Sequence, residues 1–203
     1  MNKDTTLGRR ELNKRQTRER LLNAAREVLA AEGQGGTVEE IAERAEVSRA
    51  TFFNYFPSKD DLLAALYETH MDSLTRVVDD LLARETTTQA RIVGLFTDFV
   101  REAEALPGYL RAMTLELERI STSPQVVAAR GDRFTAQIVR IVDLGVRRGE
   151  VRTDHPPQFL AQMVSAIYLS TIRYWHHDPA YDFVGTFANA GLFVAESLAP
   201  VEK

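Results

Sequence analysis

The chain has 203 residues, of which 44% are hydrophobic and 27% are charged, and it contains no cysteine. These proportions are typical of a chain that folds around a packed core, and the lack of cysteine excludes disulfides and thiolate-bound metals. No apolar run is long enough to cross a bilayer and no signal peptide stands at the start, so we expect a cytoplasmic protein without a membrane partner.

The formal net charge of −4 is distributed unevenly along the chain. Residues 1–26 carry a charge of +5, so residues 27–203 carry −9. The basic residues of the first segment are Lys3, Arg9, Arg10, Lys14, Arg15, Arg18, Arg20 and Arg26. This concentration favours contacts with phosphates near the N-terminus, and a basic helix face that serves only solubility is the alternative.

Apolar residues recur at helical spacing, and no segment shows the sustained alternation of a β-strand. The first helix is predicted from about Leu12 to Glu32, where Gly33 ends it. Ahead of it we expect a mobile basic arm, with the folded domain proper beginning at residue 14.

Each of the next three predicted helices is preceded by a side chain suited to capping it. Thr37, with a glutamate three residues later, forms a capping box, and Ser48 and Ser58 are expected to cap the next two helices. The helix after Ser58 is predicted to be about 25 residues long. The layout of residues 37–56 is typical of a helix-turn-helix, whose second helix enters the major groove of DNA.

Five further helices are predicted over the rest of the chain. They lie at 89–106, 109–120, 124–148, 157–174 and 179–198, with Ser123 and Asp178 as N-caps of the third and fifth. The predicted fold is therefore all-α with about nine helices. A three-helix N-terminal domain at 14–74 is followed by a larger helical domain at 75–203.

Small, apolar and aromatic residues stand at fixed spacings between residues 41 and 63. They are Ile41, Ala42, Ala45, Val47, Ser48, Thr51, Phe52, Tyr55, Phe56, Ser58, Lys59, Leu62 and Leu63. This pattern resembles the TetR (tetracycline-repressor) family of bacterial transcriptional regulators. The resemblance covers roughly residues 14–74, and beyond them it is one of length, helical content and the segment from Arg148 to Asp154.

Two positions depart from the family's pattern. Glu46 stands in the turn between the two helices where the family usually has glycine, so a left-handed backbone there costs on the order of 1 kcal/mol. Phe53 stands where many members carry a tyrosine that reaches a phosphate. A phenylalanine cannot donate that hydrogen bond, although it can touch a thymine methyl group.

The helix that begins at Ser48 is expected to bury Phe52 and Phe56 and to turn its other face to DNA. Arg49 suits guanine and Asn54 suits adenine, while the resemblance makes Tyr55 and Lys59 phosphate contacts. Thr37 as a cap alone and Tyr55 as a core aromatic are the alternatives. The predicted DNA contacts of the helix-turn-helix region are Thr37, Ser48, Arg49, Ala50, Thr51, Phe53, Asn54, Tyr55 and Lys59. The arm is expected to contact the minor groove or the phosphates through Arg9, Arg10, Lys14 and Arg15.

One such domain contacts too few base pairs for specificity, so we expect a homodimer on a palindromic double-stranded operator. The last two helices form the expected dimer surface, and an internal helix pair is the alternative. Its predicted residues are Phe159, Met163, Phe183, Phe187, Gly191 and Val194. The middle helices are expected to enclose a small, partly apolar ligand, with candidate liners Tyr109, Arg111, Glu116, Arg119, Tyr168, Arg173 and Trp175.

The resemblance implies a DNA-binding transcriptional regulator, a dimeric repressor that a small molecule releases from its operator. No catalytic constellation, phosphate loop or metal cluster is apparent, so neither enzymatic activity nor a cofactor is expected. His176 and His177 point about 100° apart on a helix, which favours surface imidazoles over metal ligands. The alternatives are an architectural DNA-binding protein without a ligand, and a helical ligand carrier or enzyme with a vestigial helix-turn-helix.

Overall fold

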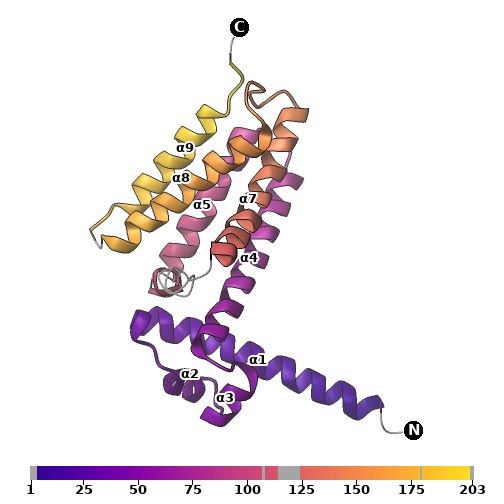
Figure 1. The fold of residues 1–203 in the computed structure, drawn as a ribbon, viewed down its shortest axis with the longest axis vertical. Helices are drawn as coiled ribbons and strands as arrows, with labels where there is room; N and C mark the ends of the chain where they lie inside the picture. Colours follow the sequence, from indigo (N-terminus) through magenta and orange to yellow (C-terminus); the bar gives the residue numbers. More distant parts are fainter. Residues whose placement is uncertain (1–3, 107, 114–123, 179, 202–203) are drawn as a thin grey trace. The chain divides into compact units, whose positions relative to one another are not determined.

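The computed structural model of the chain describes residues 4–106, 108–113, 124–178 and 180–201. Every regular element in these ranges is helical, which confirms the predicted all-α class (Figure 1). The elements are α1 (Asp4–Glu32), η1 (Gly33–Gly35), α2 (Val38–Arg44), α3 (Arg49–Tyr55), α4 (Lys59–Ala83), α5 (Thr88–Ala105), α7 (Pro124–Arg147), α8 (Pro157–His177) and α9 (Phe183–Ser197). Residues 108–113 are also helical.

Internal contacts divide the chain into two compact units. The first unit contains Met1–Thr69 and Leu106–Ile120, and the second contains His70–Ala105 and Ser121–Lys203. The division falls within α4, so one continuous helix supplies its first turns to one unit and its later turns to the other. The domain limits drawn from the sequence, 14–74 and 75–203, stay a prediction.

The first helix is longer than predicted. α1 begins at Asp4 rather than near Leu12, so the expectation of a mobile arm ahead of the helix is wrong for residues 4–11. The added turns contain arginine, glutamate and leucine, which favour helix, and no proline that would interrupt it. α1 ends as predicted at Gly33, whose φ of 58° is the left-handed conformation that glycine adopts without a steric cost.

The caps of the helix-turn-helix form as predicted. Oγ1 of Thr37 accepts a hydrogen bond from the backbone N–H of Glu40 at 3.2 Å, and the Glu40 carboxylate accepts the backbone N–H of Thr37 at 2.7 Å. Oγ of Ser48 accepts the N–H of Thr51 at 3.0 Å. These bonds satisfy backbone donors that the first turn of a helix leaves without partners.

The turn between α2 and α3 keeps its left-handed residue although it lacks glycine. Glu46 has a φ of 54°, the one positive value among the described non-glycine residues. The backbone N–H of Glu46 donates to Glu43 O at 2.9 Å, and that of Val47 donates to Ala42 O at 2.9 Å. The turn therefore closes α2 in the left-handed conformation that the resemblance implies.

We predict that Glu46→Gly stabilises the protein, because glycine adopts this φ without the clash of a β-carbon. The free energy of unfolding should rise by about 0.5–1 kcal/mol in urea titrations. The matched control is Glu43→Gly, an exposed position inside α2, which should lower it by about 1 kcal/mol. A loss of stability in both variants would contradict this account of the turn.

Aromatic side chains fill the core of the second unit. The Phe187 ring lies 5.0 Å from Phe96 of α5, 5.2 Å from Phe99 of α5 and 4.9 Å from Tyr168 of α8, measured between ring centroids. A β-carbon added to Gly191 would stand 3.0 Å from the side chain of Phe96, so this glycine lets α9 pack closely on α5. α9 is thus a core helix of this unit.

The start of α9 differs from the prediction. Asp178 does not cap it: its backbone N–H donates to Tyr174 O at 3.1 Å and closes α8. The cap is Asp182, whose carboxylate accepts the N–H of Gly185 at 3.0 Å. Two aspartates stand close together here, and the tertiary structure uses the second because α8 runs as far as His177.

A buried arginine joins the end of α4 to the start of α5. Arg91 is fully buried, and its Nε and Nη2 donate to the carbonyls of Leu81 at 3.0 Å and Arg84 at 2.6 Å. Glu150, which follows α7, accepts both the N–H and the hydroxyl of Thr88 at 2.7 Å. These bonds lower the pKa of Glu150, so the carboxylate stays charged where it caps α5.

Candidate nucleic-acid interface

α3 has one buried and one exposed face, as the sequence predicts. Phe52 and Phe56 are buried, with ring centroids 6.0 Å apart, and Ile41 and Ala45 of α2 are buried as well. Thr51 and Tyr55 are half-buried at the margins of the two faces. The exposed residues are Arg49, Ala50, Phe53 and Asn54.

The hydroxyls predicted to touch DNA at the helix ends already have partners. Oγ1 of Thr37 donates to the Glu40 carboxylate at 2.8 Å, in addition to accepting the Glu40 N–H. Oγ of Ser48 lies 2.8 Å from Oγ1 of Thr51. Capping therefore accounts for Thr37 and Ser48 without a phosphate, and their contact with DNA stays a prediction.

Lys59 is half-buried at the first position of α4 and lies near α2. The pKa of Glu40 is lowered, first by its hydrogen bonds from Thr37 and further by the positive charge of Lys59. Just before Lys59, Oγ of Ser58 accepts the N–H of Asp61 at 3.1 Å, which is the predicted cap of α4. This cap places the lysine next to the helix-turn-helix.

Sequence reasoning missed the surroundings of Arg49. Nε of Arg49 lies 3.0 Å from Oε1 of Glu39 on α2, and its guanidinium carbon lies 5.5 Å from the centroid of the Phe53 ring. The spacing of four residues between Arg49 and Phe53 was a signal in the sequence. The pairing with Glu39 was not, because it depends on how α2 and α3 pack.

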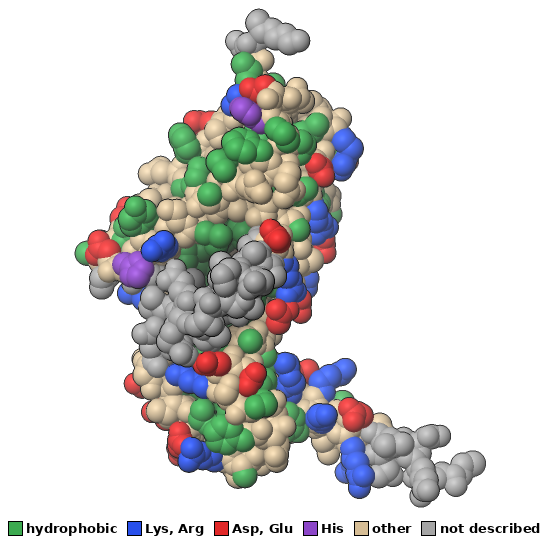
Figure 2. Space-filling model, in the orientation of Figure 1, with side chains coloured by type: hydrophobic (Ala, Val, Ile, Leu, Met, Phe, Trp, Pro, Cys, Tyr) green, Lys and Arg blue, Asp and Glu red, His purple; other side chains and the backbone are tan. Residues whose placement is uncertain are grey.

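The basic residues of α1 project into solvent. Arg9, Arg10, Lys14 and Arg15 are all exposed, and Figure 2 shows Lys and Arg side chains along this part of the helix. An α-helix is about 10–12 Å wide and the minor groove about 6 Å, so a helical α1 cannot enter that groove as an extended arm would. The predicted minor-groove contact is therefore disfavoured, and phosphate contact remains.

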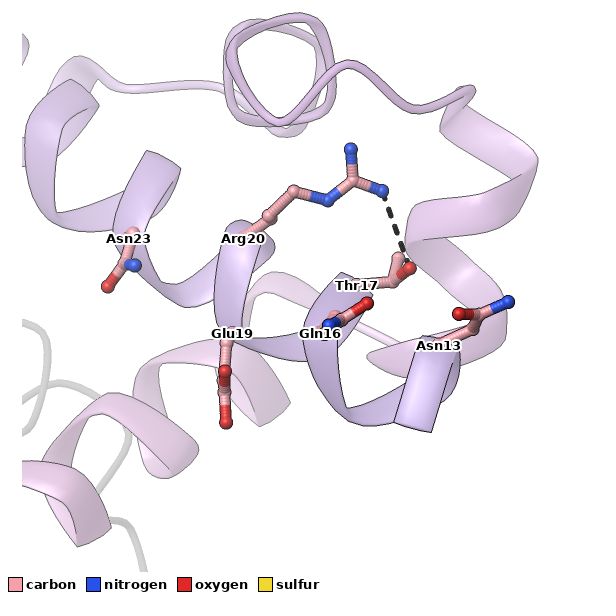
Figure 3. Close-up of a pocket in the computed structure, with 6 residues that line it drawn as sticks. All are labelled: Asn13, Gln16, Thr17, Glu19, Arg20 and Asn23. Carbon is pink, nitrogen blue, oxygen red and sulfur yellow. Dashed lines mark hydrogen bonds between the residues drawn. The ribbon is translucent and has the colours of Figure 1, made fainter. Parts of the chain in front are cut away.

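A shallow, open depression lies on the same helix. Six polar side chains of α1 line it, and Nη2 of Arg20 donates to Oγ1 of Thr17 at 3.4 Å (Figure 3). The other lining residues are Asn13, Gln16, Glu19 and Asn23. The polar surface of α1 thus continues beyond its four predicted basic contacts toward α2.

The structure describes five of the predicted ligand-pocket residues, two in the first unit and three in the second. Tyr109 is buried and Arg111 half-buried in the first unit, whereas Tyr168 and Trp175 are buried in the second. Arg173 is exposed on α8, so it is wrong as a liner of an interior pocket. Glu116 and Arg119 lie outside the described residues.

Tyr168 is a core residue of the second unit. Its ring centroid lies 5.0 Å from that of Phe96 and 4.9 Å from those of Phe134 and Phe187. Burial raises the pKa of its hydroxyl well above the ordinary value, so the group is neutral.

The predicted dimer surface is partly corrected. Phe183, Phe187, Gly191 and Val194 are buried within the chain itself, so they cannot offer a surface to a second copy. These four residues pack inside the chain, which was the alternative to a dimer surface, because the side of α9 that carries them faces α5. Phe159 and Met163 are exposed, at 41% and 44%. Other large apolar residues exposed on α8 and α9 are Leu169, Tyr174, Val184, Leu192 and Phe193.

In the described part of the chain, no group of three histidine, aspartate or glutamate side chains is placed to hold a metal ion. His177 is exposed, and the side chain of His176 lies outside the described part. No described helix is long and apolar enough to span a membrane.

Comparison with known proteins identifies the helix-turn-helix region independently. The family model of the bacterial regulatory proteins of the tetR family matches residues 21–66. The HTH-type transcriptional activator FasR of Mycolicibacterium smegmatis is 31% identical over 162 residues, which cover 78% of this chain and 71% of FasR. The transcriptional regulator AcuR of Cereibacter sphaeroides is 26% identical over 184 residues, covering 82% and 81%.

Solved structures share the fold over nearly the whole chain. FadR of Thermus thermophilus, described as a TetR-family transcriptional repressor in complex with lauroyl-CoA, is 25% identical with a TM-score of 0.69, and the match covers 92% of this chain and 97% of FadR. FadR of Bacillus subtilis, in complex with stearoyl-CoA, has a TM-score of 0.71 at 21% identity, covering 89% and 98%. The second likeness concerns the fold alone.

Proposed function

Because the chain belongs to the TetR family of bacterial regulatory proteins and is a DNA-binding transcriptional regulator, we propose that two copies bind a palindromic operator and that a small, partly apolar ligand releases them. The observation that carries the DNA-binding site is the division of α3. Phe52 and Phe56 face the core, and Arg49, Ala50, Phe53 and Asn54 face outward. The proposal assigns no catalytic activity to the chain and places its action in the cytoplasm.

The exposed face of α3 carries the base contacts in this proposal. Arg49 donates two hydrogen bonds to guanine, and Asn54 pairs with adenine. Ala50 and Phe53 pack against thymine methyl groups or the groove wall. The remaining contacts reach the phosphates: Tyr55 and Lys59 from the edge of the helix-turn-helix, with Thr37, Ser48 and Thr51 beside them.

The exposed basic side of α1 adds phosphate contacts. Arg9, Arg10, Lys14 and Arg15 spread over about two helical turns, so they meet the sugar-phosphate backbone as a charged surface. Such contacts raise affinity for any sequence and set no base preference.

We predict that base-contact and phosphate-contact variants differ in their dependence on salt. Arg49→Ala and Asn54→Ala should each lower affinity for the operator about 10- to 100-fold and leave the slope of log Kd against log salt nearly unchanged. Lys59→Ala should reduce that slope by about one. The operator is obtained by selecting bound fragments from genomic DNA. Equal losses on random and selected DNA for all three variants would contradict these roles.

The outer face of α8 and α9 supports a dimer with a second copy of the chain. Phe159, Met163, Leu192 and Phe193 are between 41% and 63% exposed, and large apolar side chains gathered on one surface are typical of protein interfaces. Two helices from each copy would form a four-helix bundle about a two-fold axis. That symmetry matches a palindromic operator.

Met163→Glu and Phe193→Glu should each convert the dimer to monomer, because a buried unpaired carboxylate strongly opposes association. Light scattering after size-exclusion chromatography measures the mass, and operator affinity should fall with it. Ala136→Glu, an exposed position on α7, is the matched control and should remain dimeric. Dimers of unchanged stability in both test variants would place the interface elsewhere.

For the ligand we propose a long-chain acyl compound, and for the regulator a repressor. Two structures with this fold contain acyl-CoA molecules, and one of them is described as a repressor. The second unit is apolar enough to surround such a chain, with Phe96, Phe99 and Phe187 at its centre. α4 runs through both units, so it can transmit a change in the second to α3. Ligand and operator then weaken each other by the same factor.

Lauroyl-CoA, stearoyl-CoA and acyl-free CoA test this proposal. The acyl compounds should raise the free energy of unfolding by about 2.7 kcal/mol at 100 times their Kd, and should lower operator affinity. Acyl-free CoA should do neither. No shift with any of the three, together with binding of DNA that is indifferent to sequence, would favour an architectural protein instead.

A further inference from the structure

Two neighbours hold the guanidinium of Arg49 at the outer surface of α3. Oε1 of Glu39, in the first turn of α2, lies 3.0 Å from Nε of Arg49. The Phe53 ring, one turn along α3, lies beneath the guanidinium at 5.5 Å from its carbon. One contact is ionic and uses the Nε edge, and the other uses the face of an aromatic ring.

Both neighbours have a favourable place in the structure around them. Glu39 stands just after the capping box at Thr37, where a carboxylate is favoured by the positive end of the helix dipole. The Phe53 ring meets the buried ring of Phe52 edge-on, with centroids 5.4 Å apart and planes at 83°. The guanidinium of Arg49 therefore contacts a carboxylate from α2 and an aromatic ring from α3.

This arrangement leaves the end of the arginine available. The ion pair with Glu39 is formed through Nε, and the Arg49 side chain is 66% exposed, so the two terminal nitrogens can still serve as donors. Those two nitrogens are the donors that meet O6 and N7 of guanine in the major groove. An exposed arginine without such neighbours distributes its charge over nearby phosphates as readily as over a base.

We propose that Glu39 and Phe53 are positioning residues that present Arg49 to one guanine of each operator half-site. The proposal rests on the base-reading role of Arg49 proposed above. Glu39 has a second effect in this proposal: beside a base-reading Arg49 its carboxylate lies close to the DNA and repels phosphates. Glu39 and Phe53 thus strengthen the discrimination between sequences, and Glu39 in addition weakens binding that is independent of sequence.

Phe53 also gains an explanation. The family's usual tyrosine offers a hydroxyl to a phosphate, which phenylalanine cannot do. A platform beneath a guanidinium needs only the aromatic face, so the hydroxyl is dispensable in this chain. The two residues act on the same group, so their effects on guanine preference depend on Arg49.

The test selects the bound duplexes from a pool of randomised DNA. It is carried out with the full-length protein and with its variants Arg49→Ala, Glu39→Gln and Phe53→Leu. Arg49→Ala should abolish the preference for guanine at one position of each half-site. Glu39→Gln and Phe53→Leu should both weaken the preference at that same position about three- to tenfold, and Glu39→Gln should leave the other positions unchanged. Glu39→Gln should also raise affinity for unrelated DNA about two- to threefold.

Glu43→Gln is the matched control, because Glu43 lies one turn after Glu39 on the same side of α2 and is exposed. It removes the same charge, so it should raise affinity for unrelated DNA and leave the guanine preference intact. Thermal unfolding checks that each exposed substitution leaves the fold in place.

Double variants separate the possible failures. In the Arg49→Ala background, Glu39→Gln and Phe53→Leu should have no further effect on base preference at the guanine position. A change at a different position in the Glu39→Gln selection, independent of Arg49, would mean that Glu39 reads cytosine itself and would overturn the proposal. Unchanged preference in both single variants would also overturn it. If Arg49→Ala leaves the preference unchanged, the proposed role of Arg49 fails first.

Discussion

The burial of Phe52 and Phe56 fixes α3 in the core of its unit, and the DNA-facing surface depends on this packing. α3 spans only Arg49–Tyr55, and a helix so short is not stable alone. Each buried ring contributes about 1.5–3 kcal/mol, which outweighs the intrinsic instability of two turns. The same burial fixes the rotation of the helix about its axis, so the residues that face outward follow from those that face inward.

The turn before α3 shows how backbone strain and recognition are joined. Glu46 adopts a left-handed conformation that glycine would adopt more easily, and α2 and α3 meet at the resulting angle. That angle brings Glu39 of α2 to the guanidinium of Arg49 on α3. The ion pair between these two exposed side chains contributes little to the free energy of folding. It can still decide which base the arginine reads, because base recognition depends on where the guanidinium is held.

The second unit distributes its apolar residues over two surfaces. One side of α9 packs on α5 through Phe187 and Gly191, and the other leaves Leu192 and Phe193 in solvent. Arg91, in the first turn of α5, secures the end of α4 by donating to the carbonyl of Leu81 and to that of Arg84, the residue that follows the helix. α4 is thereby attached in the unit that is proposed to bind ligand, while its first turns belong to the unit that carries α3.

The sequence by itself determined the features that depend on neighbours three or four residues apart. These include the caps at Thr37, Ser48 and Ser58 and the two faces of α3, while the left-handed Glu46 was expected from the family resemblance. Only the tertiary structure decided which apolar surface each helix buries. α9 is apolar nearly all round, so periodicity could not tell its core side from its exposed side. The pairing of Glu39 with Arg49 and the carbonyls that Arg91 binds depend on how helices pack, which local spacing does not encode.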